Sequence, residues 1–223
     1  MGYLNEEYTR QSDLISMDKL DKKIVIIGAG AIGGWTSLSL AKMGFLNQVV
    51  IDFDKVDTVN LSSQLFRYKD IGSTKVAALQ SIITEFTNKQ IEVICNKYEN
   101  EIVNADILVM AVDSMEVRSK IWKANKKMGL VKMMIDPRMG SEMALLYVMN
   151  PNDAKDIETY EKTLYSDDNA LSEPCTRKST QYCALTLSGL ICAQVKSLVN
   201  DLPYQRITQF DIPKGAYQSY TKV

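Results

Sequence analysis

Three closely spaced glycines form the clearest chemical signal in this chain of 223 residues. Gly28, Gly30 and Gly33 follow a β-branched run and begin a stretch with helical spacing, and Asp52 ends the next apolar run roughly twenty residues further on. Glycine permits a tight turn and a close approach of the main chain. Phosphate oxygens can then accept hydrogen bonds from amides at a helix N-terminus, while a carboxylate binds ribose hydroxyls. The pattern predicts a nucleotide site without identifying the nucleotide, and the residues of the predicted turn are Gly28, Gly30, Ala31, Ile32 and Gly33.

A cluster of polar side chains follows the same predicted elements. It comprises Asp52, Asp54, Asn60, Gln64 and Lys75, together with Asp113, which follows an apolar run. Because the carboxyl ends of parallel strands meet at one edge of an open sheet, these side chains can converge where such sheets bind ligands. Lysine for phosphate and aspartate for Mg²⁺ are what nucleotidyl transfer requires. A lysine that solvates a helix and an aspartate that caps one are the better interpretations of each residue alone, but jointly the residues favour a site.

The glycine turn alone also fits an NAD-dependent oxidoreductase, although an NAD site would not explain the polar cluster. The absence of histidine further restricts the catalytic mechanisms that this protein could use. It excludes Ser-His-Asp and Cys-His nucleophiles, HExxH metalloprotease sites and imidazole acid–base catalysis. Any reaction of this protein must therefore proceed without imidazole.

The net charge and the cysteine content argue against further classes of protein and of binding site. The 26 Lys and Arg residues against 27 Asp and Glu give a net charge of −1, which provides no basic footprint for nucleic-acid binding. The four cysteines, at positions 95, 175, 183 and 192, form no CxxC pair, which argues against a structural zinc site and a disulfide framework. The N-terminus lacks the order of a signal peptide, and polar residues interrupt the apolar stretches before they could span a bilayer. We expect a cytoplasmic protein without membrane or nucleic-acid partners.

Apolar runs alternate with helical patterns along the first two thirds of the chain. The strands are apolar throughout, which is typical of a parallel sheet covered by helices on both faces. The predicted strands span 22–28, 48–54, 90–98, 106–112 and 131–136, and the predicted helices span 29–44, 73–88 and 114–129. The fold class is therefore α/β, with a doubly wound, Rossmann-like and mostly parallel sheet.

The pattern changes after residue 136. We expect a few added C-terminal strands, including 141–151, and a short polar helix over 153–164. An exposed crossover loop over about 165–178 precedes a long apolar helix over 180–203, which should be buried in the monomer or at a subunit interface. Residues 1–20 are expected to form an N-terminal helical segment, and residues 21–223 a single domain.

The ordered motifs resemble a known family. The chain contains, in this order, "YTRQ", "IVIIGAGAIGG", "VIDFDKVDTVNL", "IGSTKV", "AVDS" and a late cysteine. This set is similar to the ThiF/MoeB/HesA branch of the ubiquitin-activating-enzyme superfamily, from about Tyr8 to Phe210. The resemblance implies a homodimer that uses ATP and Mg²⁺ to adenylate the C-terminal glycine carboxylate of a ubiquitin-like or sulfur-carrier protein, or of a peptide, ending in Gly-Gly. That carboxylate is already ionised at neutral pH, so the reaction needs positioning and charge neutralisation rather than a proton acceptor.

The resemblance makes residues 1–20 a possible dimer arm and residues 21–223 a single ATP-binding adenylation domain. It also implies roles for single residues. Asp52 would hold the ribose, and Asp113 would hold Mg²⁺. Arg10 matches an arginine that family members insert into the site of the partner subunit, although a solvated N-terminal arginine is an equally good interpretation. The phosphates would be bound or neutralised by side chains of the polar cluster, namely Asn60, Gln64 and Lys75.

Two departures from the family pattern matter. Ser63 stands where the family typically has an arginine, so one phosphate-binding cation is missing, and Arg67 or Arg138 could replace it. If neither does, the protein would be a nucleotide-binding scaffold subunit without adenylation activity. The zinc-binding CxxC pairs of many relatives are also missing, which predicts no zinc.

Cys175 occupies the place of the family cysteine that forms a thioester or persulfide with the activated carrier. Arg177, Lys178 and the following helix N-terminus would lower its pKa and favour the thiolate. An ordinary exposed loop cysteine is the alternative. The other three cysteines are expected to be small core residues without a chemical role.

Overall fold

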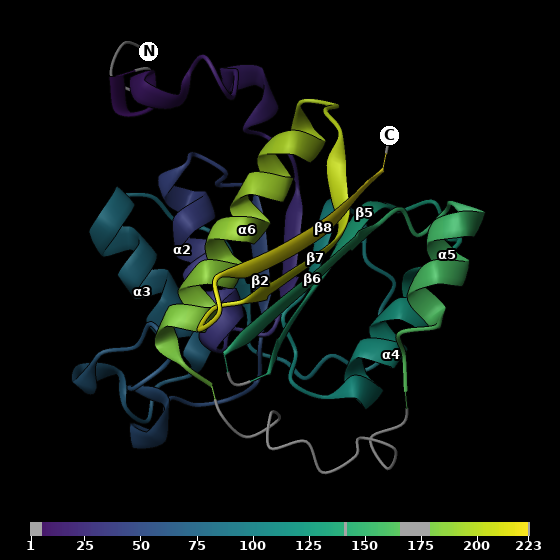
Figure 1. The fold of residues 1–223 in the computed structure, drawn as a ribbon. Coiled ribbons are helices and arrows are strands. Elements are labelled where there is room, and N and C mark those ends of the chain that lie inside the picture. The colour runs from purple at the N-terminus through teal and green to yellow at the C-terminus, as the bar shows by residue number, and fades with distance from the viewer. Residues whose placement is uncertain (1–5, 141, 166–178, 223) are drawn as a thin grey trace.

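The computed structural model describes residues 6–140, 142–165 and 179–222, which form one eight-stranded sheet with helices on both faces (Figure 1). The strand order is β3-β2-β1-β4-β5-β6-β7-β8. The first five strands in this order are mutually parallel, and the last three pair antiparallel. Their bounds are β1 Ile24–Ile27, β2 Gln48–Ile51, β3 Glu92–Ile94, β4 Ala105–Met110, β5 Val131–Gly140, β6 Met143–Met149, β7 Tyr204–Asp211 and β8 Ala216–Lys222. The predicted doubly wound sheet with added C-terminal strands is confirmed.

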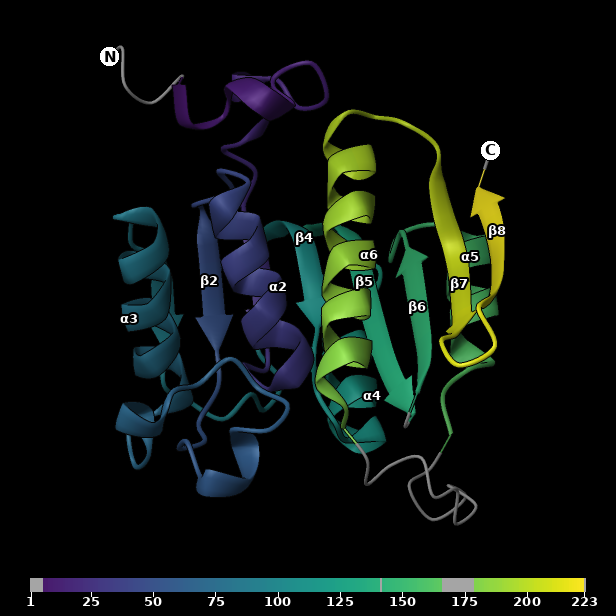
Figure 2. The same ribbon diagram turned by 60° about the vertical axis from the view of Figure 1, so that its left-hand side comes forward.

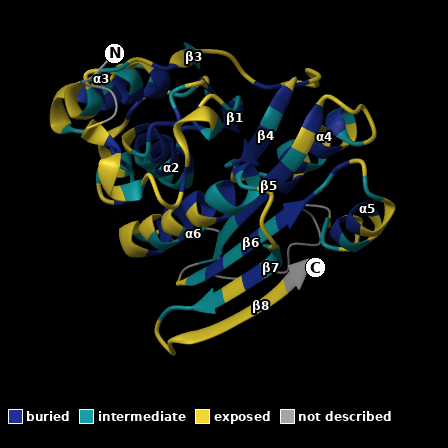
Figure 3. Ribbon diagram, turned by 90° about the horizontal axis from the view of Figure 1, so that it is seen from above, coloured by how far each residue is buried: buried dark blue, intermediate teal, exposed yellow. Residues whose placement is uncertain are grey.

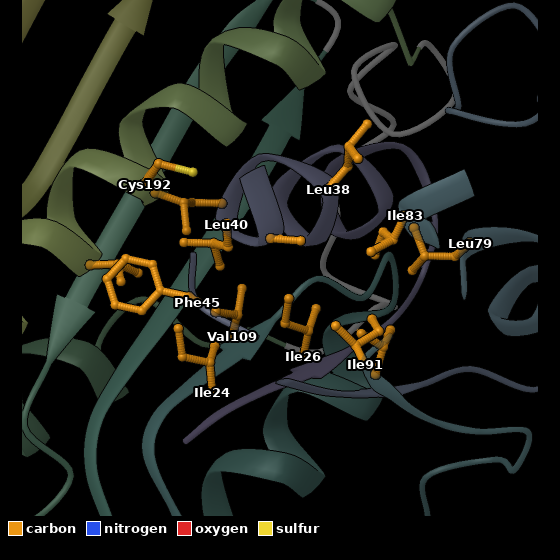
Figure 4. Close-up of a cluster of buried hydrophobic side chains, with 14 of the residues drawn as sticks. Ile24, Ile26, Leu38, Leu40, Phe45, Leu79, Ile83, Ile91, Val109 and Cys192 are labelled. Atoms are coloured by element: carbon orange, nitrogen blue, oxygen red, sulfur yellow. The ribbon is translucent and has the colours of Figure 1, made fainter. Parts of the chain in front are cut away.

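Two hydrophobic cores lie on the two faces of the sheet, because side chains alternate along each buried strand. In β1, Ile24 and Ile26 belong to the core under α2 (Ala31–Lys42), α3 (Lys75–Thr87) and α6 (Gln181–Val199). Figure 4 shows part of this core, in which both isoleucines lie near Leu40. The alternate residues of β1, Val25 and Ile27, belong to the second core, with side chains of α4 (Met115–Asn125) and α5 (Ala154–Glu161). This double burial is why the strands are apolar throughout.

Burial falls off toward both edges of the sheet. The residues of β3 are exposed or half-buried, and β8 is largely exposed, while β4 is mostly buried and five of the ten residues of β5 are buried (Figure 3). The edge position of β3 overturns one expectation. Cys95 directly follows this strand and is exposed rather than a core residue, because an apolar pattern alone does not show that a strand lies at an edge.

The chain leaves β1 in one direction for β2 and later places β4 on the other side of β1. At such a switch point the connections diverge at the carboxyl ends of the strands and leave a crevice where α/β sheets bind ligands. The turn from β1 to α2 and the turn from β4 to α4 both lie there (Figure 2).

The N-terminal segment lies at the opposite edge of the sheet. Its described part contains two 3₁₀ helices, η1 (Thr9–Gln11) and η2 (Met17–Lys19). Tyr8 and Leu20 pack against Gly44, just beyond the end of α2, and the side chain of Gln11 donates to the main chain of Met43. The segment is thus fixed to the end of α2 that lies away from the glycine turn.

Two cysteines are buried as expected. Burial raises the pKa of the Cys183 thiol to about 11, with a further contribution from the charge of Glu142, and raises that of Cys192 to about 12. The thiolate is the reactive form, so both side chains are protonated and unreactive at neutral pH.

These burial differences predict the order of thiol labelling. Maleimide at pH 7.5 should label Cys95 in the native protein, whereas Cys183 and Cys192 should be labelled only after denaturation, as measured by peptide mass spectrometry. Cys95→Ser provides the control for assigning the fast adduct. Native-state labelling of Cys192 at a rate like that of Cys95 would contradict the described core.

Candidate nucleotide site

The turn between β1 and α2 packs tightly against the end of β4. Gly28 has φ +100°, and a Cβ on it would lie 2.3 Å from the carbonyl oxygen of Ala111. A Cβ on Gly33 would lie 1.9 Å from the carbonyl oxygen of Gly28. Both glycines are therefore required by the packing of the protein itself.

Gly30 differs from these two glycines. A Cβ placed on it would meet no atom within 4 Å, so the fold does not demand a glycine here. Gly30 is the N-cap of α2 and provides no side-chain cap. Within the described part of the chain, the amides of Ala31 and Ile32 donate to no acceptor. The open space thus lies against unpaired helix N-terminal amides, which is the arrangement that binds phosphate oxygens.

Asp52 connects this turn to the end of β2. Its Oδ2 accepts a hydrogen bond from the amide of Ala29 at 2.7 Å, and its Oδ1 accepts one from the amide of Asp54 at 2.7 Å. Each carboxylate oxygen keeps a further lone pair, so ribose hydroxyls can still donate to it. Sequence reasoning assigned Asp52 to ribose alone and missed its role in bracing the glycine turn.

Lys75 begins α3 and points back to the loop after β2. Its side chain is only 9% exposed, and Nζ lies 2.7 Å from Oδ2 of Asp54. The amide of Lys75 also donates to the carbonyl oxygen of Asp54, and Thr74 caps the helix by accepting from the amide of Ala77. Without a nucleotide, the charge of Lys75 is thus balanced by a carboxylate on the neighbouring loop.

The loop between β2 and α3 holds the two predicted amide side chains. Oδ1 of Asn60 accepts from the amide of Asp57 at 2.8 Å and closes the 3₁₀ helix η3 (Thr58–Asn60). Oε1 of Gln64 is buried and has no hydrogen-bond partner among the described residues. An unsatisfied buried carbonyl is costly, so this oxygen is suited to accept from a bound ligand or water.

Asp113 follows β4, two residues after Ala111 and therefore close to the glycine turn. It is exposed and forms no hydrogen bond or ion pair with another described residue. An unpaired carboxylate at this edge has the donor chemistry that a hard divalent cation takes. No group of three or more candidate metal ligands occurs in the described part of the chain, so any ion here would also need oxygens from its ligand or from water.

Arg67 and Arg138, the two arginines that could replace the cation missing at Ser63, both form ion pairs within the chain. Nε and Nη2 of Arg67 each lie 2.9 Å from an oxygen of Asp70, and Nη1 donates to Glu85. Arg138 pairs with the buried Asp136 at 2.8 Å. Ser63 itself is only 6% exposed. Neither guanidinium is therefore free in this conformation.

One predicted residue is not brought into this arrangement. Arg10 is exposed within η1, at the far end of α2, and a helix of 12 residues is about 18 Å long. Arg10 therefore cannot reach the glycine turn of its own chain. Cys175 lies outside the described residues.

The ThiF family profile matches residues 8–222, almost the whole chain. The chain belongs to the ThiF family. Curated ThiF-type relatives include the SUMO-activating enzyme subunit uba-2 of Caenorhabditis elegans, 35% identical over 46% of this chain and 19% of that protein. Another is the adenylyltransferase and sulfurtransferase MOCS3 of Aedes aegypti, 32% identical over 43% of this chain and 23% of that protein. The aligned part of the chain thus spans about a fifth of the length of these relatives.

Solved structures show the same fold at low sequence identity. E. coli MccB, crystallised with ATP, superimposes with a TM-score of 0.78 at 18% identity, covering 97% of this chain and 71% of MccB. PaaA gives a TM-score of 0.76 at 16% identity, covering the whole of this chain and 75% of PaaA. ThiF membership supports ATP binding, and the open cradle at Gly30 with its unpaired amides is where a triphosphate fits the residues present.

A matched pair of glycine substitutions separates packing from ligand binding. Gly33→Ala should lower the free energy of unfolding by about 1–3 kcal/mol or more, because its Cβ overlaps the carbonyl of Gly28. Gly30→Ala should cost less than about 1 kcal/mol, the scale of an N-cap change, yet weaken ATP binding because its methyl group enters the open cradle. Urea unfolding and calorimetric ATP titration measure the two effects. Unchanged ATP affinity in Gly30→Ala would argue against this cradle.

Proposed function

We propose that this protein is an ATP-dependent adenylyltransferase that activates the C-terminal glycine carboxylate of a ubiquitin-like or sulfur-carrier protein, or of a peptide. The observation that carries the proposal is the open helix N-terminus at Gly30, flanked by Lys75 and Asp113, in a chain of the ThiF family. ThiF membership favours adenylation over the NAD-dependent oxidoreductase. The relatives named above activate modifiers or sulfur carriers, and MccB was crystallised with the MccA peptide, which supports this class of acceptor.

The proposed step needs no proton transfer. A carboxylate oxygen of the acceptor forms a bond to the α-phosphorus of ATP, and the bond from that phosphorus to the pyrophosphate oxygen breaks. The protein's contribution is to orient the triphosphate on the α2 amides and to neutralise charge with Lys75, released from Asp54. Asp113 would hold Mg²⁺, which supplies further charge neutralisation when bound. A chain without histidine can perform all of these tasks.

A second subunit would be the source of the cation that is missing at Ser63. Arg67 and Arg138 are both paired within the chain, and Arg10 lies at the wrong edge for its own site. We propose that Arg10 enters the site of the other subunit in a homodimer. An antiparallel arrangement of two chains would bring the N-terminal edge of one to the nucleotide edge of the other.

The outer face of α6 supports such an arrangement. This helix of 19 residues contains a single charge, Lys196, and runs from the nucleotide edge to the N-terminal segment, where Asn200 donates to the carbonyl oxygen of Leu14. Its outer residues include Tyr182 and Leu185, which are 45% and 43% exposed. No described element covers them, and Figure 2 shows α6 on the outside of its layer. A two-fold axis near the middle of α6 would bury this apolar face and reverse the second chain.

A pyrophosphate exchange assay tests the proposed activity. With ATP, Mg²⁺ and peptides ending in Gly-Gly, the protein should exchange labelled pyrophosphate into ATP, and Lys75→Ala should reduce the rate by roughly 10²–10³-fold, as for loss of one electrostatic donor. Lys132→Ala is the matched control, because Lys132 forms a similar 2.6 Å pair with Asp106 away from the site. ATP binding without exchange for any acceptor would instead support a scaffold subunit.

Mixed dimers test the proposed position of Arg10. Arg10→Ala and Lys75→Ala should each be inactive alone, but random mixing should restore about a quarter of wild-type exchange, because half of the dimers would contain one intact composite site. The mixture is made by co-expressing the two variants with different tags. If Arg10 acted within its own chain, or not at all, mixing would give no more than the average of the two separate activities.

A further inference from the structure

A buried arginine outside the predicted site holds the main chain beside Asp113. The side chain of Arg118, in the first turn of α4, is 5% exposed, and its Nε donates to the fully buried carboxylate of Asp136. Its Nη2 donates to the carbonyl oxygen of Val112 at 2.7 Å and to that of Pro137 at 3.3 Å. One guanidinium therefore ties the turn after β4 to the middle of β5.

Asp136 acts as the anchor for this arginine. Its second oxygen accepts from Arg138 Nε at 2.8 Å and from the hydroxyl of Tyr160 at 2.9 Å, so both oxygens are used. Arg138 in turn donates to Thr163. These contacts come from β5, α5 and the segment after α5, and they leave Asp136 little freedom to move.

We call Arg118 and Asp136, with the contacts just described, the Arg118 clamp. It lies next to Asp113, a carboxylate that no other described side chain holds in place. Asp113 lies between Val112, whose carbonyl is held by Arg118, and Ser114, whose hydroxyl caps α4 by accepting from the amide of Val117 at 3.3 Å. Asp113 forms no contact of this kind with another described residue. The position and direction of its Cα–Cβ bond are therefore set by the main chain on either side.

We propose that Arg118 is a positioning residue that orients Asp113 toward Mg²⁺-ATP through Val112. The proposal rests on the proposed function, in which Asp113 holds the ion. A buried ion pair is in general weak evidence for stability, since apolar residues often replace it without loss. A planar fork that reaches a carboxylate and two carbonyl oxygens at once is specific geometry, and lysine cannot reproduce it.

The test compares two arginines that pair with fully buried carboxylates. Arg118→Lys is the test variant, and Arg206→Lys is the control, because Arg206 pairs with Asp156 between β7 and α5. ATP affinity is measured by calorimetry with Mg²⁺ and with EDTA. Arg118→Lys should weaken binding of Mg²⁺-ATP by about 10–100-fold, as for loss of an outer-shell support of a metal ligand, and leave binding in EDTA within about two-fold. Arg206→Lys should change neither.

Hydrogen exchange without nucleotide provides a second readout. The peptide 111–117 should exchange on the order of ten-fold faster in Arg118→Lys than in Arg206→Lys, because the restraint on Val112 is lost. Unchanged exchange, or Mg²⁺-ATP affinity reduced no more than in Arg206→Lys, would overturn the proposal. If the wild type bound no ATP at all, the proposed function would fail, whereas the exchange comparison would still decide whether Arg118 restrains this turn.

Discussion

The close packing of the β1–α2 turn against Ala111 is the constraint on which the site depends. Gly28 and Gly33 leave no room for a Cβ, so the end of β1, the start of α2 and the end of β4 are held as one unit. Two features of the candidate site are attached to this unit, the unpaired amides at the start of α2 and the carboxylate of Asp113. Their separation is set by strand and helix packing before any nucleotide arrives. Such preorganisation is what electrostatic catalysis requires, because little rearrangement remains for the reaction itself.

Around this unit, three cations that were considered for the site have intramolecular partners. Lys75 pairs with Asp54, Arg67 with Asp70, and Arg138 with Asp136. These pairs differ in exposure. Asp54 is 45% exposed, so water can solvate its carboxylate when Lys75 turns to a phosphate, whereas the carboxylate of Asp136 is fully buried and would be left as an uncompensated charge if its arginine were withdrawn. Of these three cations, Lys75 is therefore the one that can most readily leave its carboxylate, Asp54, and pair with a phosphate instead.

Sequence reasoning succeeded where a signal is local or periodic. Apolar strands such as β1, the glycine turn and the helix α3 were predicted from neighbouring residues alone. It failed where an answer depends on distant partners. The exposure of Cys95 follows from the edge position of β3, and the pairing of Arg67 with Glu85 depends on how a loop folds back on α3. The double role of Asp52 and the clamp formed by Arg118 also join residues from separate elements, so no motif reveals them.

The length of α2 links assembly to the proposed chemistry. One end of this helix carries the candidate phosphate cradle, and the other end carries the segment with Arg10, so the two cannot meet within one chain. The chain also has Ser63 where the family resemblance leads us to expect an arginine. The two arginines that could replace it are paired with other residues, Arg67 with Asp70 and Arg138 with Asp136. In this conformation a single subunit would thus offer Lys75 to a triphosphate, but neither Arg67, Arg138 nor its own Arg10. An antiparallel second copy on the apolar face of α6 would supply the cation and cover that face at once, which makes the composite site a simpler account than a rearrangement of Arg67 or Arg138.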